Sequence, residues 1–339
     1  MKIKIRPILF CLFIVSLVFQ VTSFADEKKY TLNIQFENDS FGGGTDRNFS
    51  HGTRIELLTA PLPWVTKLAD KLPWFDSGIE NMSEDGLEGR GSISIGQNIY
   101  TPANTYTSSL VHGERPYAGW LYIGIGLMAT QGNEKYDRYD KLRLEIGVVG
   151  PLSYAQEIQT FWHSIFGVHV PEGWDHQLKN EPGLALYYEQ AYRIFPKKKL
   201  FGFEYDGVPH IGGCIGNVFT YLSAGYIVRI GRELKMDFGP PLVRPSLPGD
   251  GYFTSEGFYW NLFIGLDGQI VLRNIFLDGN TFRDSHSVDK NTAVGDIQAG
   301  FTIRWHNLGL SYTQIFRTKQ YRGQNGDDIL GSLGISYYF

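Results

Sequence analysis

The chain has 339 residues and a formal net charge of −4, and its charges are spread without a long run of one sign. This distribution excludes the basic surface typical of nucleic-acid-binding proteins. Aromatic residues make up 15% of the chain and glycine contributes 40 residues, a composition that favours an exported all-β protein, either a large sandwich or an outer-membrane barrel.

The N-terminus has the pattern of a secretory signal peptide, residues 1–25. Three basic residues precede an apolar run from Ile8 to Val21, and small residues fit a cleavage site after Ala25. A membrane anchor is the alternative, although the apolar run is short for a span. We therefore expect a mature barrel domain of residues 26–339, in which Cys214 is a single cysteine that forms no disulfide and fills a small apolar space.

Twelve runs of residues follow in which apolar and polar side chains alternate, the pattern of strands with one apolar face. Several exceed the about five or six residues usual in globular strands, and so suit a tilted strand that crosses about 30 Å of hydrocarbon. The runs are 31–37, 50–60, 89–97, 117–131, 138–149, 182–194, 199–209, 214–231, 256–271, 292–306, 307–318 and 328–339. They predict an all-β fold, a twelve-stranded antiparallel transmembrane β-barrel.

Two further features favour the bacterial outer membrane as the location. Aromatic residues gather at strand ends, as at Tyr117, Trp120 and Tyr122, where a membrane interface favours them. The chain ends on the alternating run Leu333–Phe339 with a terminal aromatic residue, as proteins inserted into that membrane do. We therefore expect a multi-pass protein of the cell outer membrane, surrounded by its lipids.

The other face of each strand is expected to line a narrow lumen. A barrel of twelve strands is small enough for side chains to fill most of its interior, so a wide pore is not implied. Arg143, Glu145, Asp296 and Arg304 fall on this inner face. We expect them to form internal ion pairs and hydrogen bonds.

The stretch Glu37–Gly52 joins the first two strands and is rich in glycine and oxygen-bearing side chains. Asn38 and Asp39 close one strand and Ser50 opens the next, so these side chains are expected to meet at one rim of the barrel. An amide oxygen, a carboxylate and a hydroxyl match the oxygen ligands that Ca²⁺ prefers, and Asp46 could add another. The alternative is an ordinary turn in which Asn38 and Asp39 bond to their own backbone.

Residues 155–167 form the one helix predicted in the barrel, in a rim loop. Ser153 is expected to cap its start and Gly167 to end it. Apolar residues spread around much of this helix, so we expect it to be largely packed: Ile158, Phe161, Trp162, Ile165 and Phe166.

Gln159 and His163 lie four residues apart on this helix and therefore project from one face. Their burial requires polar partners, so both are either structural residues with satisfied hydrogen bonds or parts of a reactive site. An imidazole that is neutral near physiological pH suits proton abstraction, and His163 is the candidate general base.

Arg115 lies between Glu114 and Pro116 in another rim loop. Its guanidinium could bind phosphate or carboxylate with two parallel hydrogen bonds, or it could extend its charge to the membrane interface without a ligand. The chain has no Gly-x-Ser-x-Gly motif, which excludes an α/β-hydrolase.

Together these residues resemble the lipid A 3'-O-deacylase family, over nearly the whole mature chain. The motifs that carry the resemblance are Asn38–Asp39, Asp46–Gly52, Arg115–Trp120, Gln159 with His163, and Gly173–Pro182.

The resemblance implies a twelve-stranded barrel and a Ca²⁺-dependent esterase that removes the 3'-linked acyloxyacyl chain of lipid A in lipopolysaccharide. By position it makes His163 the base that activates water, assisted by Gln159. It places Asn38 and Asp39 in the metal site with Ser50 beside them, and Arg115 at the anionic head group.

Other functions stay open at this stage. A phospholipase barrel would release fatty acid from glycerophospholipids, and a porin or adhesion barrel would have no reaction and no use for Gln159 and His163. Ser50 could also act as a nucleophile that forms an acyl-enzyme, in place of activated water.

Overall fold

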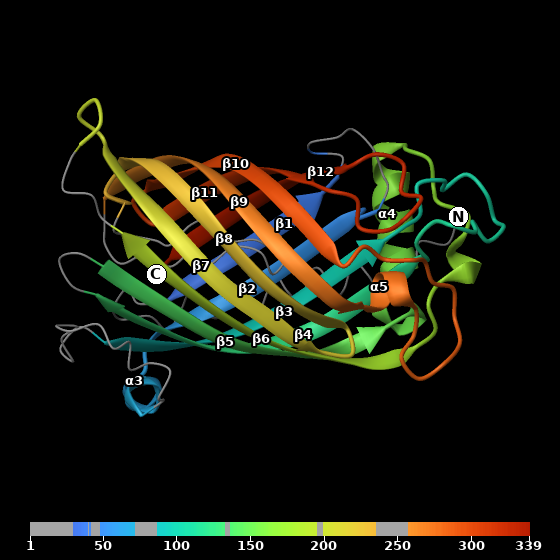
Figure 1. The fold of residues 1–339 in the computed structure, drawn as a ribbon, viewed down its shortest axis with the longest axis horizontal. Coiled ribbons are helices and arrows are strands. Elements are labelled where there is room, and N and C mark those ends of the chain that lie inside the picture. The colour runs from blue at the N-terminus through green and yellow to red at the C-terminus, as the bar shows by residue number, and fades with distance from the viewer. Residues whose placement is uncertain are drawn as a thin grey trace.

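A computed structural model describes residues 30–39, 41, 48–71, 87–132, 136–194, 199–234 and 257–339. The predicted signal peptide and Asp46 lie outside these residues. Within them the chain forms one closed antiparallel barrel of twelve strands, as the sequence predicts, in which β12 pairs with β1 (Figure 1). The strands are β1 Thr31–Asn38, β2 His51–Pro61, β3 Glu88–Tyr100, β4 Ala118–Gly132, β5 Tyr136–Val149, β6 Glu181–Ile194, β7 Glu204–Gly216, β8 Phe219–Arg232, β9 Phe258–Asn274, β10 Ala293–Trp305, β11 Leu308–Arg317 and β12 Asp328–Tyr338.

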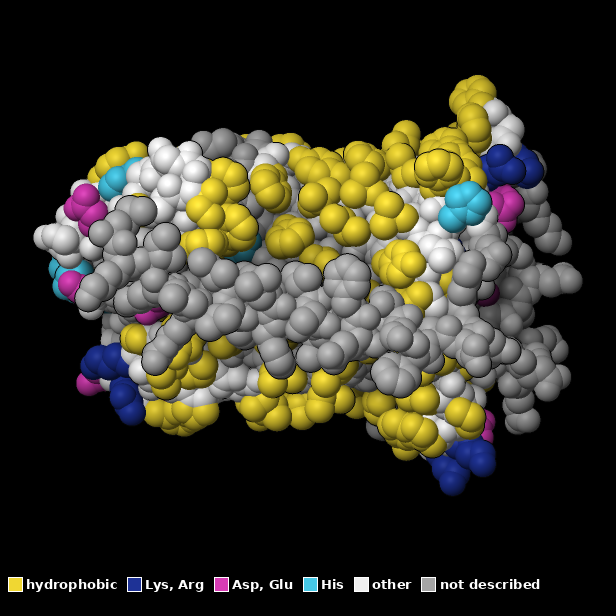
Figure 2. Space-filling model, turned by 180° about the vertical axis from the view of Figure 1, so that it is seen from behind, with side chains coloured by type: hydrophobic (Ala, Val, Ile, Leu, Met, Phe, Trp, Pro, Cys, Tyr) yellow, Lys and Arg dark blue, Asp and Glu magenta, His cyan; other side chains and the backbone are white. Residues whose placement is uncertain are grey.

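The predicted alternation of the strands separates lumen from lipid. In β10, Asp296, Gln298 and Arg304 are buried inside the barrel, while Ile297 and Trp305 are exposed on its outside. On the face that Figure 2 shows, the apolar side chains gather along the middle of the barrel and the charged ones at its two ends. This arrangement matches an apolar belt with polar ends, the surface of a protein that spans a membrane with strands.

Ion pairs line the lumen, as expected for its buried charges. Arg143 pairs with its neighbour on the inner face, Glu145, at 3.0 Å, and Lys141 reaches Glu56 on β2 at 3.3 Å. Arg317 likewise pairs with Asp296. Each buried charge in these pairs is compensated, which burial in a low-dielectric interior requires.

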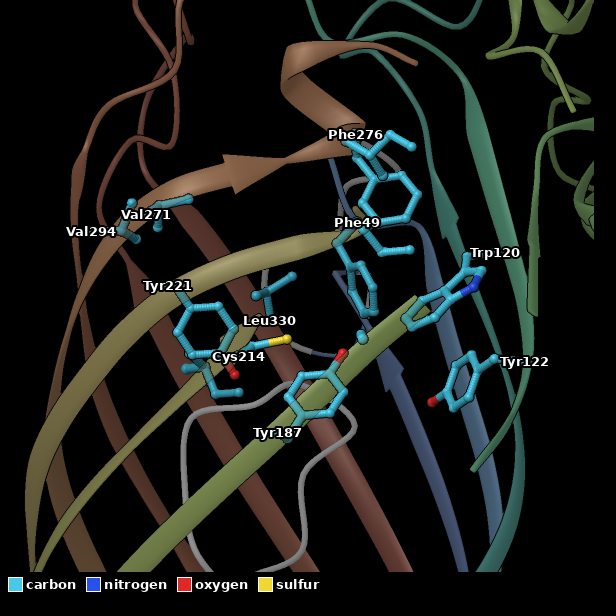
Figure 3. Close-up of a cluster of buried hydrophobic side chains, with 14 of the residues drawn as sticks. Phe49, Trp120, Tyr122, Tyr187, Cys214, Tyr221, Val271, Phe276, Val294 and Leu330 are labelled. Atoms are coloured by element: carbon cyan, nitrogen blue, oxygen red, sulfur yellow. The ribbon is translucent and has the colours of Figure 1, made fainter. Parts of the chain in front are cut away.

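An aromatic cluster fills the lumen between strands that are distant in sequence. Phe49 packs edge-on against Tyr100 with 5.3 Å between ring centroids, and Tyr100 stacks on Phe276 at 4.0 Å. Figure 3 shows Phe49 and Phe276 close together, with Cys214 deeper among the inward-pointing side chains. Cys214 is buried, and its thiol donates to the carbonyl of Phe219 at 3.4 Å, so its predicted role as a small filler is confirmed.

Two predicted strand ranges are wrong in their limits. The runs 199–209 and 214–231 correspond to β7 and β8, which lie at Glu204–Gly216 and Phe219–Arg232. Leu200 and Phe203 instead close a tight turn with reciprocal backbone hydrogen bonds of 2.9 and 3.0 Å. Gly212 and Gly213 within β7 have no side chains, so the alternation of apolar and polar residues cannot be recognised there.

The helices lie at the two ends of the barrel. The helix α3 (Pro63–Asp70) lies at one end, and α4 (Ala155–Phe166) and α5 (Ile275–Asp278) lie at the other (Figure 1). We call the latter end the α4 rim and the former the opposite rim. Within the described ranges, no helix has the length and apolar character needed to cross a membrane.

Candidate active site

The first two strands meet at the α4 rim, as predicted. Asn38 ends β1, and its side-chain amide donates to the carbonyl of Ser50 at 2.6 Å. The Ser50 amide donates to the carbonyl of Ile99 on β3 at 3.1 Å. The Ser50 hydroxyl lies 2.5 Å from that of Thr101, just past the end of β3. These contacts bring Asn38, Ser50 and Thr101 together at the end of three neighbouring strands.

Asp39 follows Asn38 directly and is only 2% exposed. A carboxylate at that depth needs positive charge or hydrogen-bond donors around it, and carboxylate oxygens are among the ligands that Ca²⁺ prefers. Together with the amide oxygen of Asn38, it offers the hard oxygen chemistry that Ca²⁺ takes. No group of three His, Cys, Asp or Glu residues that could hold a metal occurs among the described residues, so this pair would need further oxygen ligands.

A tight turn attaches α4 to the barrel wall. The chain turns at Gly150 (φ 100°), and the Ser153 hydroxyl donates to the Gly150 carbonyl at 2.6 Å. From β3, the amide of Gln97 donates to the Ser153 carbonyl at 2.6 Å. Gly119 on β4 makes room, because a Cβ there would collide with Ser153.

The predicted cap and packing of α4 are wrong. Tyr154, in a left-handed conformation, occupies the N-cap position without a side-chain hydrogen bond, because the Ser153 hydroxyl is bonded to the preceding turn. Only the N-terminal half of the helix is packed, and the apolar residues of its C-terminal half are 40, 56 and 70% exposed: Trp162, Ile165 and Phe166. The helix extends past the small cluster of Ile99, Tyr117, Ala155 and Trp174 that holds its first turn.

Gln159 is buried where α4 meets this cluster. Its side-chain oxygen accepts a hydrogen bond from the Trp174 indole at 3.0 Å, which fixes the orientation of the amide. The amide nitrogen is buried and has no hydrogen-bond partner among the described residues. A buried donor of this kind needs a partner, so the nitrogen is available to a water molecule or to a ligand oxygen.

His163 is partly buried one turn further along α4. Its Nδ1 contacts the carbonyl oxygen of His169, and since a carbonyl only accepts, Nδ1 carries the proton. The lone pair therefore lies on Nε2. His169 is itself held by the Thr105 carbonyl at 3.1 Å and by stacking on Tyr106 at 3.8 Å, so the orientation of His163 is set by the loop before β4.

Arg115 lies at the α4 rim, but its side chain is buried there rather than exposed. Its side chain is 1% exposed, its Nη1 donates to the Asn48 carbonyl at 2.6 Å, and its guanidinium lies 5.1 Å from the centre of the Tyr100 ring. Burial lowers the pKa of the guanidinium. This position excludes an arginine that extends into the interface. Arg115 also lines a small pocket with Tyr117 and His176.

Ile99 connects the two halves of this site. Its carbonyl holds Ser50, while its side chain packs against Ala155 and Trp174, which position Gln159. The sequence reading missed Thr101 as a partner of Ser50. The one available signal was its place at the start of the loop that follows the predicted strand 89–97.

Comparison with known proteins decides the family. The sequence model of the outer membrane protein LpxR matches residues 8–339 of this chain. The chain belongs to the LpxR family. The resemblance to lipid A 3'-O-deacylases that the rim motifs carry is thereby confirmed, as is the outer-membrane class of the protein.

A solved structure supports the fold of this LpxR family member. LpxR from Salmonella typhimurium is 23% identical, with a TM-score of 0.70 over 91% of this chain and 100% of that one. The β-domain of the Bordetella autotransporter BrkA is 9% identical, with a TM-score of 0.46 over 92% of this chain and 100% of that one. A search of curated proteins found no match.

Proposed function

We propose that this protein is a calcium-dependent lipid A 3'-O-deacylase, an esterase that hydrolyses the bond holding the 3'-linked acyloxyacyl chain of lipid A. The observation that carries the proposal is on α4. His163, with its tautomer set by a backbone carbonyl, and Gln159, with a buried donor that lacks a partner among the described residues, share one helix at the rim of an LpxR-family barrel.

In this reaction His163 is the general base. Its Nε2 takes a proton from a water molecule as the water oxygen attacks the ester carbonyl carbon. The same proton then passes to the sugar oxygen as the ester bond breaks. The products are a free acyloxyacyl carboxylic acid and a 3'-hydroxyl on lipid A, so atoms and charge balance without a further reactant.

Gln159 supports the negative charge that develops on the carbonyl oxygen. Its amide nitrogen is a donor already held in place by the Trp174 contact, so little reorganisation is needed when charge develops. Asn38 and Asp39 are the residues that would hold calcium. When bound, the ion would polarise the ester carbonyl as a Lewis acid.

Ser50 is better placed to support the site than to attack the ester. A serine nucleophile needs a base within hydrogen-bond reach, and the Ser50 hydroxyl instead meets the hydroxyl of Thr101 at 2.5 Å. Trapping a covalent acyl group on Ser50 would favour the acyl-enzyme scheme over activated water.

Mass spectrometry of lipid A tests the proposal. Cells that express the wild-type chain should lose the mass of one acyloxyacyl unit from lipid A, and His163→Ala should lower the rate by at least about 100-fold. His112→Ala, at an exposed histidine of the same rim, is the matched control and should retain activity. Unchanged lipid A in cells with folded wild-type protein would contradict the deacylase.

Calcium and the alternative functions are tested with purified protein. Chelation with EGTA should abolish deacylation, and added Ca²⁺ should restore it. Full activity in EGTA would contradict the role of Asn38 and Asp39 as metal ligands. Fatty acid released from phospholipid vesicles that lack lipid A would favour a phospholipase, and ion conductance without hydrolysis would favour a porin.

A further inference from the structure

Asn48 has an unusual backbone and is held from several sides. Its φ is 66°, a left-handed conformation that is unfavourable for residues other than glycine, although asparagine tolerates it best. Its amide donates to the Thr101 carbonyl at 2.9 Å. Its own carbonyl accepts from Arg115 at 2.6 Å, and its side-chain oxygen accepts from the Tyr321 hydroxyl at 3.2 Å.

A further contact of Asn48 comes from the far end of the chain. The side-chain amide of Asn48 donates to Oδ1 of Asp328 at 2.6 Å, across 280 positions of sequence. Asp328 is the first residue of β12, and two amides from the preceding loop complete its shell. Gln320 donates to Oδ2 at 2.7 Å and Gln324 to Oδ1 at 3.0 Å.

These contacts act on the candidate site because of where Asn48 lies. It stands two residues before Ser50, and Phe49 between them is fixed in the aromatic stack with Tyr100. Asn38 in turn donates to the Ser50 carbonyl, so a shift of Asn48 would move Ser50 and the end of β1 together. Such a shift would impair catalysis, since a displacement of about 1 Å can lower the reaction rate by about 100-fold.

We propose that Asp328 is a positioning residue of this enzyme, which acts through Asn48 to hold Ser50 and Asn38 in place. The inference rests on the proposed function. Asp328 is buried, and its carboxylate already accepts three hydrogen bonds, so contact with the substrate is not its role. The Asp328 carboxylate stabilises the left-handed turn at Asn48, and this turn positions Ser50 and Asn38.

Steady-state kinetics of Asp328→Ala give the first test. The value of kcat should fall by about tenfold or more, because the geometry of Ser50 and Asn38 is disturbed. KM should change less than kcat, although Arg115 also contacts Asn48. The matched control is Asp206→Asn, which removes an equally buried carboxylate at the opposite rim, where it pairs with Arg229. It should leave kcat unchanged. Wild-type kcat in Asp328→Ala, or a change confined to KM, would overturn the proposal.

A charge swap tests the pair itself. Asn48→Asp places two carboxylates face to face and should lower kcat as Asp328→Ala does. The double variant Asn48→Asp, Asp328→Asn restores a donor opposite an acceptor and should recover part of the lost activity. A double variant no more active than Asn48→Asp would overturn the proposed coupling.

Amide hydrogen exchange separates this inference from the proposed function. The amides of Asn48 and Ser50 are bonded to the carbonyls of Thr101 and Ile99, so a peptide covering 48–52 should be protected in the wild type. Asp328→Ala should lose that protection and Asp206→Asn should keep it. A wild-type protein without deacylase activity would refute the function alone, whereas unchanged exchange in Asp328→Ala would refute the positioning role alone.

Discussion

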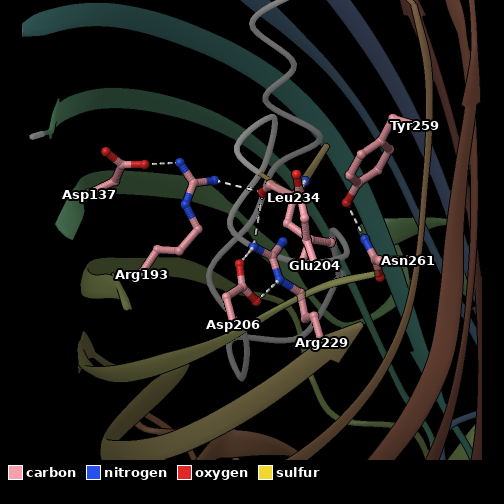
Figure 4. A network of polar contacts seen from close by, with 8 residues as sticks. All are labelled: Asp137, Arg193, Glu204, Asp206, Arg229, Leu234, Tyr259 and Asn261. Atoms are coloured by element: carbon pink, nitrogen blue, oxygen red, sulfur yellow. Dashed lines mark hydrogen bonds and ion pairs between the residues drawn. The ribbon is translucent and has the colours of Figure 1, made fainter. Parts of the chain in front are cut away.

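Buried arginines lie at both rims of the barrel, and Arg115 at the α4 rim differs from Arg193 and Arg229 at the opposite rim in how its charge is met. At the opposite rim, Arg229 forms a two-pronged ion pair with Asp206, and Arg193 pairs with Asp137 (Figure 4). Both arginines also donate to the carbonyl of Leu234, at 3.2 and 3.0 Å. Each guanidinium of this network meets a carboxylate, as expected for a part of the lumen that serves the fold.

At the α4 rim, Arg115 is buried to the same degree without an ion pair among the described residues. Its Nη1 meets a backbone carbonyl, while its Nε and Nη2 are buried and have no hydrogen-bond partner there. Gln159 leaves a buried donor in the same condition. The difference lies in charge compensation: Arg193 and Arg229 each meet a carboxylate, whereas the hydrogen bond of Arg115 is to a backbone carbonyl, an arrangement that suits binding of an anionic ligand.

Gln159→Leu should break this contrast most strongly. It removes the donor proposed for the oxyanion and also the acceptor of the Trp174 indole, so deacylation should fall by about 100-fold, measured as loss of the acyloxyacyl unit from lipid A. Gln156→Leu, at an exposed position of the same helix, should be active. Activity retained in Gln159→Leu would mean that this buried amide has no part in the reaction.

Arg115→Lys should have a smaller effect and sharpen the comparison. Lysine can still donate to the Asn48 carbonyl but lacks the planar fork that grips phosphate. If Arg115 binds the lipid head group, KM should rise by about tenfold with kcat nearly unchanged.

The equivalent change at the opposite rim, Arg229→Lys, breaks the two-pronged contact with Asp206. It should lower the unfolding temperature and leave both kinetic constants unchanged. An unaltered KM in Arg115→Lys would assign Arg115 to holding Asn48 rather than to the substrate.

Cys214→Ala should have the smallest effect. The thiol fills space in the aromatic cluster and makes one weak hydrogen bond, so the cost to the free energy of unfolding should be about 1 kcal/mol, with no change in deacylation. Thermal unfolding of the barrel in detergent measures the first and lipid A analysis the second. Lost activity with an intact barrel would contradict the role of Cys214 as filler.

Local sequence was enough for the barrel and for the residue types of the site. Alternation reports which face each side chain takes, because successive strand residues point to opposite sides whatever the strand pairs with. It therefore predicted the inner face of β10 and the meeting of Asn38 with Ser50. The predicted strand limits were wrong at β7, where two adjacent glycines have no side chains to distinguish an inner from an outer face. The predicted packing of α4 was wrong because half of this apolar helix extends beyond the barrel.

By itself, the sequence determined twelve strands, their lumen and lipid faces, and a rim that carries a histidine, an amide and oxygen-bearing side chains. Only the tertiary structure decided that Arg115 is buried, that Thr101 meets Ser50, and that Asp328 holds Asn48. The physical reason is closure of the barrel. Pairing of β12 with β1 brings the last strand beside the first loop. Local sequence patterns do not predict which side chains then face each other.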